Sequence, residues 1–458
     1  MSDATTTAFR GADIRVLGDE DARAREIHRR MQGALCGIMT SSGSLNKAPT
    51  TPRMFVEGAE LTGVHHWFGR EPAKPGAYHI GGYGTVPFEA RIRILGETLE
   101  RYAGFSACVE GRFPVLHASH EELVTRREPV VDTDVFRLFL PDQLAADGFP
   151  FQAFSPTTPM DWVKIPSLVD DSEQYVPAHH FLLGNLPGPE EPWTLPAVTT
   201  GTAAHTDPGA AFLSALYEII QVDAAVGHWH SPAPSLRIVP DARTRLLQDV
   251  IDRRLRGGLE PEFHLLPSPD LPGFNVACIL RKPPGITPAV SVGLGSGPSL
   301  VRSMYRALLE TVGVQTLAGW SAVEDRLGAG AEVPLSERLG QIFDLDQNVA
   351  YYAGIEGART VEERFALHAT VRAGDLPADD DRPAREIARS LLDTFRRTGK
   401  RLFGADFTSV DIRRLGFSVI RAWSPDTLSL PLPSAPPQAH PRFAAFGGFT
   451  NPLPHPYP

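Results

Sequence analysis

The sequence predicts an α+β fold with mixed or antiparallel sheets. Between Gly81 and Pro298, short apolar runs alternate with proline-rich turns, which is the pattern of a substantial sheet. Proline and glycine number 42 and 41 among 458 residues, both above average usage, and this favours loops and turns over long helical bundles. Helical periodicity appears in separate segments, so we expect helices and sheets in one chain.

The overall composition is that of a globular protein large enough to bury a core in two or three lobes. Its net charge of −10 argues against a nucleic-acid backbone as partner. The N-terminus shows no secretion signal, and no apolar stretch approaches the roughly 20 residues that span a bilayer. Cys36, Cys108 and Cys278 lie far apart without metal-ligand spacing, as expected of reduced thiols. We therefore expect a cytoplasmic protein that binds neither nucleic acid nor membrane.

The chain divides into an N-terminal segment, residues 1–65, and a main domain, residues 66–458, whose last part, residues 424–458, is rich in proline. Other elements indicated by periodicity are helices at 19–31 and 384–400 and strands within 159–166 and 274–280.

A first helix carrying acidic residues is predicted at 88–102, after a glycine-rich segment, with Pro87 suited to its first turn. Apolar residues form one stripe, and Glu97, Glu100 and Arg101 fall on the opposite face. By itself this is also the pattern of a solvated helix face.

A second helix is predicted at 208–226, and it is apolar nearly all round, as in a buried helix. Ser214, Glu218 and Gln221 nevertheless line one narrow stripe. A buried glutamate must be paired, protonated or bound to a cation, so a structural salt bridge and a functional site both stay open.

A third helix is predicted at 298–312, after another glycine-rich segment. Arg302, Arg306 and Glu310 share one face at intervals of four residues. Alone, Arg306 and Glu310 are compatible with a simple helical ion pair. Together, the acids of three helices and their arginines favour a site for Mg²⁺ and a nucleotide, because Mg²⁺ takes oxygen ligands and arginine binds phosphate. The chain has no P-loop and no protein-kinase motif set, so such a site has another design.

The last eight residues place proline at every second position, from Pro452 to Pro458. Proline fixes φ and pushes the preceding residue towards extended geometry, which predicts a stiff rod ending in a carboxylate. We expect residues 454–458 to enter the core, and removal of Tyr457 and Pro458 to leave folding nearly intact. A frayed tail is the alternative.

These motifs resemble the YcaO family of ATP-dependent peptide-modifying enzymes. The resemblance covers roughly residue 70 to the end and rests on residues 90–102, 201–221 and 306–310, in this order and with a PxPxP end. It implies a YcaO-like fold with three acid-bearing helices around a nucleotide cavity, and the tail is similar to that of azoline-forming members. The implied ligands of ATP are Glu97, Glu100, Arg101, Glu218, Gln221, Arg306 and Glu310, and those of Mg²⁺ are Glu97, Glu100, Glu218 and Glu310.

The resemblance implies an ATP-dependent cyclodehydratase that acts on a ribosomally made precursor peptide. A Cys, Ser or Thr side chain attacks the preceding carbonyl, ATP phosphorylates the amide oxygen, and loss of phosphate gives a thiazoline or oxazoline. The Pro458 carboxylate is the implied base. A separate leader-binding protein, a flavin-dependent azoline dehydrogenase and a homodimer are implied partners.

Several positions depart from the family's pattern. Arg93 stands where the first motif has serine, and after Glu218 the expected Glu-Arg pair reads Gln221-Val222. The second motif of the family has serine, asparagine, glutamate and glutamine. At these positions, in the same order, this chain has Ala203, Thr206, Ala210 and Ser214. Two other functions therefore stay open, a degenerate scaffold subunit without catalysis and a thioamide- or amidine-forming enzyme.

Overall fold

The computed structural model describes residues 8–9, 12–13, 19–33, 36–45, 51–69, 79–188, 190–195, 198–255, 259–283, 285–328, 335–337, 339–366 and 368–457. The chain forms two compact units. The smaller comprises Met1–Asn46 and Met54–Tyr102, and the larger comprises Lys47–Arg53 and Ala103–Pro458. The division expected from the sequence, at residue 65 with a tail from 424, stays a prediction.

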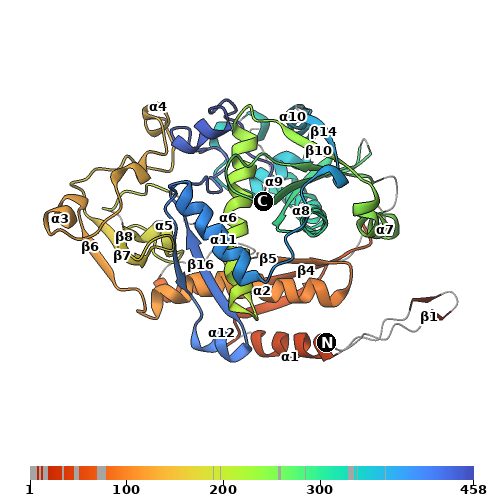
Figure 1. Cartoon of the computed structure of the whole chain (residues 1–458), viewed down its shortest axis with the longest axis horizontal. Coiled ribbons are helices and arrows are strands. Elements are labelled where there is room, and N and C mark those ends of the chain that lie inside the picture. Colours follow the sequence, from red (N-terminus) through yellow and green to blue (C-terminus); the bar gives the residue numbers. More distant parts are fainter. Residues whose placement is uncertain are drawn as a thin grey trace. The chain divides into compact units, whose positions relative to one another are not determined.

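Helices and strands are distributed along the whole chain (Figure 1). The helices are α1 Asp19–Met31, α2 Pro87–Val109, α3 His120–Thr125, α4 Pro141–Leu144, α5 Ala178–Phe181, α6 Pro208–His230, α7 Arg245–Arg254, α8 Leu300–Gly328, α9 Leu345–Ala353, α10 Ile355–Phe365, α11 Ala384–Arg397 and α12 Val410–Leu415. The strands are β1 Ala8–Phe9, β2 Ala12–Asp13, β3 Met39–Ser44, β4 Phe55–Leu61, β5 His79–Gly84, β6 Val115–Ala118, β7 Met160–Pro166, β8 Glu173–Pro177, β9 Thr202–His205, β10 Ser235–Val239, β11 Pro261–Leu265, β12 Phe274–Arg281, β13 Val290–Gly297, β14 His368–Arg372, β15 Phe403–Asp406 and β16 Ser418–Trp423.

The smaller unit combines an antiparallel sheet of order β3-β4-β5 with α1 and the first part of α2. Arg91 of α2 holds these elements together. Its guanidinium lies 3.6 Å from the buried Asp21 carboxylate of α1 and 3.5 Å from the Glu57 carboxylate of β4. Burial raises the pKa of Glu57, and the positive charge of Arg91 opposes that shift.

The larger unit contains a five-stranded sheet of order β13-β12-β11-β10-β14, antiparallel except for the parallel pair β10 and β14. Two antiparallel three-stranded sheets, β15-β16-β9 and β6-β7-β8, complete it. The prediction of an α+β fold with mixed and antiparallel sheets is therefore confirmed.

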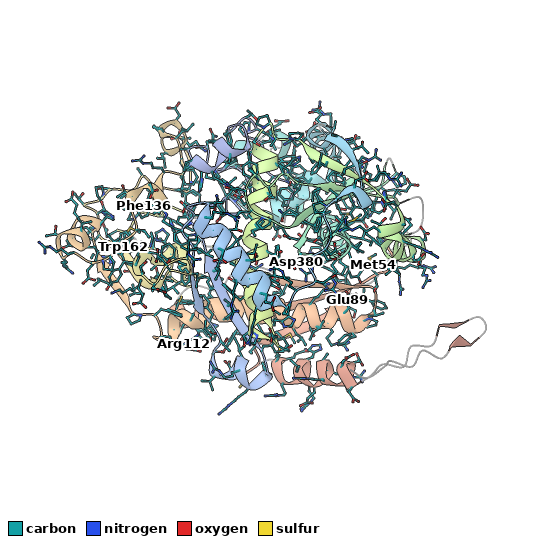
Figure 2. The ribbon with its side chains drawn as sticks, in the orientation of Figure 1. Met54, Glu89, Arg112, Phe136, Trp162 and Asp380 are labelled. Carbon is teal, nitrogen blue, oxygen red and sulfur yellow. The ribbon has the colours of Figure 1, made fainter. Side chains whose placement is uncertain are left out.

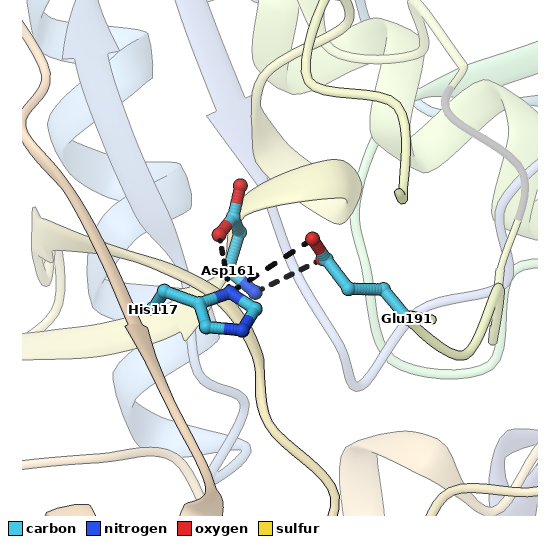
Figure 3. A group of neighbouring side chains, drawn as sticks. All are labelled: His117, Asp161 and Glu191. Carbon is cyan, nitrogen blue, oxygen red and sulfur yellow. Dashed lines mark hydrogen bonds and ion pairs between the residues drawn. The ribbon is translucent and has the colours of Figure 1, made fainter. Parts of the chain in front are cut away.

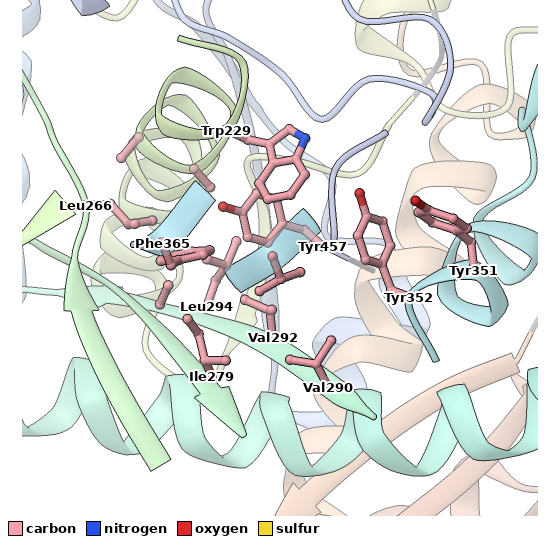
Figure 4. Packing of buried hydrophobic residues seen from close by; sticks show 14 of the residues in the cluster. Trp229, Leu266, Ile279, Val290, Val292, Leu294, Tyr351, Tyr352, Phe365 and Tyr457 are labelled. Carbon is pink, nitrogen blue, oxygen red and sulfur yellow. The ribbon is translucent and has the colours of Figure 1, made fainter. Parts of the chain in front are cut away.

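The five-stranded sheet is buried on both faces at β12 and β13. Alternate residues point to opposite faces of a strand. Those on one face join an apolar cluster with α6, α9, α10 and Tyr457, while α8 covers the other face (Figure 4). The sheet and tail members of the cluster are Ala277, Ile279, Val290, Val292, Leu294 and Tyr457. The end of the chain thus belongs to the core of this unit.

Helix α6 runs through the larger unit and packs against α11 and β16. By length and composition it is apolar enough to cross a membrane, and 67% of its most apolar window is buried inside the protein. Helix α6 therefore contradicts the expectation that no apolar stretch approaches that length. The helix is apolar because it is buried, and a helix surrounded by protein needs no polar face.

The sheet of β6, β7 and β8 has its own aromatic packing, with Phe136 and Trp162 labelled in Figure 2. Trp162 is buried, and its Nε1 donates to the carbonyl of Ala118 at 2.9 Å. Arg112, just before β6, donates to carbonyls at the end of β15, including that of Phe407 at 3.0 Å. These contacts fix the position of β6 within the larger unit.

Candidate active site

A strand, a two-residue turn and a helix occur together three times in this chain. Strands β5, β9 and β13 are each followed, two residues later, by α2, α6 and α8. The predicted glutamates Glu97, Glu218 and Glu310 each lie ten residues beyond the first residue of their helix. At about 1.5 Å per residue they occupy the same depth, about 15 Å along each helix. The three predicted acid-bearing helices therefore belong to three copies of one strand–turn–helix arrangement.

Helix α2 packs closely on β5 because β5 carries glycines. A Cβ atom at Gly82 would lie 2.3 Å from the carbonyl oxygen of Ala90 and 2.7 Å from the nitrogen of Ile94. The buried side of α2 therefore includes Ala90 and Ile94. Phe88 and Ile92, which helical periodicity assigns to the apolar stripe predicted for this helix, are only half-buried.

The predicted acidic face of α2 is half-exposed. Arg101 pairs with Glu97 one turn earlier, with 2.8 Å between Nη2 and Oε1, and Glu100 lies beside them. Arg93 forms a second such pair with Glu89 at 3.3 Å. Half-exposed pairs of this kind contribute only a few tenths of a kcal/mol to helix stability.

Helix α6 begins at a capped N-terminus, where Asp207 accepts a hydrogen bond from the amide of Ala210 at 2.7 Å. Most of its side chains are buried. One half-buried stripe interrupts them, formed by Ala210, Ser214, Glu218 and Gln221. The polar stripe predicted from the sequence is thus the accessible side of a core helix.

Arg421 of β16 is a charged residue close to this stripe that the sequence analysis missed. Its side chain is 3% exposed and donates to the hydroxyl of Thr202 at 3.1 Å and to the carbonyl of His180 at 3.3 Å. Burial lowers the pKa of Arg421 to about 10, and the negative charge of Glu218 opposes that shift. Arg421 is therefore still a cation at neutral pH. The available signal was an arginine inside the apolar run 417–423.

Helix α8 lies directly on the glycines of β13. A Cβ atom at Gly295 would come within 2.2 Å of the carbonyl oxygen of Ser303. Arg306 is exposed, and its Nη1 donates to the carbonyl of Ser296 at 3.0 Å, near the end of β13. Glu310 follows one turn later and is half-buried.

Residues 454–457 of the proline-rich tail enter the core of the larger unit, as expected, while Pro458 lies outside the described residues. Trp229 Nε1 donates to the carbonyl of Leu453 at 3.0 Å, Tyr352 donates to the carbonyl of Pro454, and Asn348 donates to the carbonyl of His455 at 2.7 Å. His455 and Tyr457 are buried. The carboxylate of Pro458 lies outside the described residues, so its role as a base stays a prediction.

Side chains near the altered second motif already have structural roles. Asp223 is fully buried and accepts hydrogen bonds from Arg442, with 2.6 Å between Oδ2 and Nη2. His205 Nδ1 accepts from the amide of Asp207 at 2.9 Å, and Asp207 caps α6. Asp223 in particular is therefore committed to an ion pair rather than to Mg²⁺.

The predicted nucleotide-binding residues form local groups on single helices. Glu97, Glu100 and Arg101 share α2, Glu218 and Gln221 share α6, and Arg306 and Glu310 share α8. The residues of α2 belong to one compact unit and the others to the second unit. Convergence of the two sets on one cavity stays a prediction.

A profile described as YcaO cyclodehydratase, ATP- and Mg²⁺-binding, matches residues 81–428. This region holds the whole of the second and third strand–turn–helix units and the first from Gly81 of β5 onwards. The chain belongs to the YcaO family. No curated protein matches the chain by sequence.

Three solved structures share the fold. A heterocyclase in complex with substrate and cofactor has a TM-score of 0.69 and 15% identity, over 95% of this chain and 57% of that one. The YcaO protein of Methanopyrus kandleri, bound with AMPPCP and Mg²⁺, has a TM-score of 0.55 and 18% identity, over 88% of each chain. A chain of the E. coli microcin synthetase McbBCD complex with pro-MccB17 bound has a TM-score of 0.59 and 13% identity, over 93% of this chain and 98% of that one. The present chain therefore spans little more than half of the first heterocyclase.

Proposed function

We propose that this YcaO protein is an ATP-dependent cyclodehydratase that converts Cys, Ser or Thr residues of a ribosomally made precursor peptide to thiazoline or oxazoline. The observation that carries this proposal is the position of Glu97, Glu218 and Glu310 at one depth in three equivalent strand–turn–helix units. The family match and the fold shared with heterocyclases support it.

The donor set suits MgATP, because carboxylate oxygens are the ligands that Mg²⁺ prefers and guanidinium groups bind phosphate oxygens. In the proposal, Glu97, Glu100, Glu218 and Glu310 hold Mg²⁺. Arg101, Gln221 and Arg306 contact the nucleotide, and Arg421 is added as a neighbouring cation. When bound, ATP supplies the phosphoryl group that makes the amide oxygen a leaving group.

The remaining chemistry falls to the peptide and to the tail. The peptide hydroxyl or thiol adds to the preceding carbonyl carbon, the former carbonyl oxygen departs as phosphate, and a carbon–nitrogen double bond forms. Two protons leave, one from the attacking hydroxyl or thiol and one from the amide nitrogen as the double bond forms. We assign the Pro458 carboxylate as the base that accepts a proton at the reacting amide, and solvent takes the other. A buried tail anchored by Trp229, Tyr352 and Asn348 is suited to holding a terminal charge at a fixed depth.

Two other functions are weighed against this one. A scaffold subunit without catalysis is favoured by Ala203 and Val222, which replace polar family residues and pack in apolar clusters. A thioamide- or amidine-forming enzyme fits the family but not the azoline-type tail. In the leading proposal the protein is cytoplasmic and works with a leader-binding protein and a flavin-dependent azoline dehydrogenase, and it forms a homodimer.

The first test is MgATP binding by isothermal titration calorimetry, with Glu218→Gln against the matched substitution Glu386→Gln in α11. We expect Glu218→Gln to weaken binding at least about tenfold, equivalent to about 1.4 kcal/mol, and Glu386→Gln to leave it unchanged. A wild-type protein that does not bind MgATP would favour the scaffold. Equal binding by the two variants would remove Glu218 from the site.

The second test addresses the tail by adding two residues after Pro458, which displaces the carboxylate by about 6 Å at about 3.1 Å per residue. With a Cys/Ser/Thr-rich peptide encoded beside the gene, we expect loss of ring formation, measured by mass spectrometry as loss of water, while MgATP binding is retained. Undiminished ring formation by the extended chain would exclude the Pro458 carboxylate as the base.

A further inference from the structure

A histidine and two carboxylates, none of them a predicted nucleotide-binding residue, meet at the sheet of β6, β7 and β8 (Figure 3). His117 of β6 and Asp161 of β7 are directly opposed in the antiparallel register, so their side chains share one face. Glu191 reaches the same point from the segment after α5. Their ligand atoms all lie within 4.8 Å of one another.

Each carboxylate of this group is held through one oxygen and presents the other to His117. Asp161 Oδ2 accepts a hydrogen bond from Asn185 Nδ2 at 3.0 Å, and Glu191 Oε2 accepts one from the amide of Asp161 at 3.2 Å. Asp161 Oδ1 and Glu191 Oε1 then lie 3.0 and 3.8 Å from His117 Nδ1. Outer hydrogen bonds of this kind orient the ligands of metal sites.

The charge balance of the group also favours a cation. The carboxylates of Asp161 and Glu191 lie side by side, and their side chains are 22% and 14% exposed. Within the described parts of the chain, no lysine or arginine forms an ion pair with either of them. A divalent ion placed between the two carboxylates would neutralise both.

We propose that His117, Asp161 and Glu191 form a binding site for a divalent transition-metal ion of the zinc type. Imidazole nitrogen and carboxylate oxygen are both zinc ligands, and three protein ligands leave a fourth position for water, while Mg²⁺ and Ca²⁺ prefer oxygen alone. Tetrahedral zinc with bonds of about 2.0–2.2 Å separates its ligand atoms by about 3.4 Å. The distances of 3.0 and 3.8 Å lie on either side of that value.

The site keeps one side open to solvent, because the His117 side chain is 56% exposed. A water molecule therefore completes the coordination. Since His117 and Asp161 belong to adjacent strands and Glu191 to a connecting segment, the ion joins that segment to the sheet. The site involves neither ATP nor peptide, so it stands or falls separately from the proposed cyclodehydration.

The test is titration of the full-length protein, freed of metal with a chelator, with Zn²⁺ in the presence of excess Mg²⁺. Wild type should bind one Zn²⁺ more per chain than His117→Ala, and Glu191→Gln should weaken that binding at least about tenfold. Glu190→Gln, the same substitution at the exposed neighbouring residue, should bind as wild type does. Circular dichroism checks that each variant is folded.

Cobalt(II) gives a second readout that follows geometry as well as affinity. Wild type should show the visible absorption of tetrahedral Co²⁺, and Asp161→Asn, which keeps the side-chain shape, should lose it. If wild type binds no Zn²⁺, or if His117→Ala and Asp161→Asn bind it unchanged, the group is an ion pair of His117 with Asp161 and the proposal is overturned.

Discussion

Replacement of Tyr457 by alanine should destabilise the larger unit by about 3–5 kcal/mol, the usual cost of removing a buried aromatic side chain. Tyr457 is 1% exposed, and its ring centroid lies 6.4 Å from that of Trp229 and 5.8 Å from that of His455. The loss is large against a typical stability of about 5–15 kcal/mol. Deleting Tyr457 and Pro458 removes the same ring, so the burial of Tyr457 argues against the sequence-based expectation that this truncation leaves folding nearly intact.

The measurement is urea denaturation followed by tryptophan fluorescence, with Tyr457→Phe as the control. The Tyr457 hydroxyl is buried without a hydrogen-bond partner among the described residues. Its removal should therefore change the free energy of unfolding by less than about 1 kcal/mol, or raise it. A loss below about 1 kcal/mol for Tyr457→Ala would refute the reasoning, because it would show that the tail is not packed in the core.

Two further predictions concern packing and pH. Gly295→Ala should lower the free energy of unfolding by about 1–3 kcal/mol, because the new Cβ would overlap the carbonyl of Ser303. In the control Gly319→Ala, in α8, the new Cβ would meet only an atom of Pro288 at 3.9 Å, so the free energy of unfolding should stay the same or rise. Urea denaturation measures both. Burial lowers the pKa of His455 from 6.5 to about 4, so its contribution to stability is present above pH 6.5 and is lost as pH falls towards 4. Between pH 7 and pH 5, the free energy of unfolding should therefore fall less in His455→Gln than in wild type, and the difference should be at most about 1.4 kcal/mol per pH unit. The same fall in both proteins would contradict the lowered pKa of His455.

Local sequence patterns located many of the helices and strands. The helix expected at 19–31 is α1, the one expected at 384–400 is α11, and the strand expected within 274–280 is β12. Helix α8 continues to Gly328, well beyond residue 312, because the residues that follow include apolar ones on several sides and no proline stops the helix. Hydrophobic periodicity predicts which side of a helix is apolar, but it does not predict the residue at which the helix ends.

Other features depend on contacts that no local pattern contains. His117 and Asp161 are brought together by strand register, and Glu191 joins them from a distant part of the sequence. Arg421 is buried next to α6 because β16 pairs with β9, and no sequence motif predicts this strand pairing. The proline-rich tail suggested a rod, but the donors that anchor it, such as Trp229 and Asn348, follow only from the tertiary structure.

The buried C-terminus has a consequence for biosynthesis. Domains usually begin to fold as they leave the ribosome, from the N-terminus onwards. Here Tyr457 belongs to the same cluster as Trp229 and Val292, so a residue made late completes a core built mostly from residues made long before. Until Tyr457 has left the ribosome, this cluster has a gap where its ring belongs. The larger unit therefore reaches its native packing only after Tyr457 has emerged, and chains that terminate before Tyr457 lack part of their core.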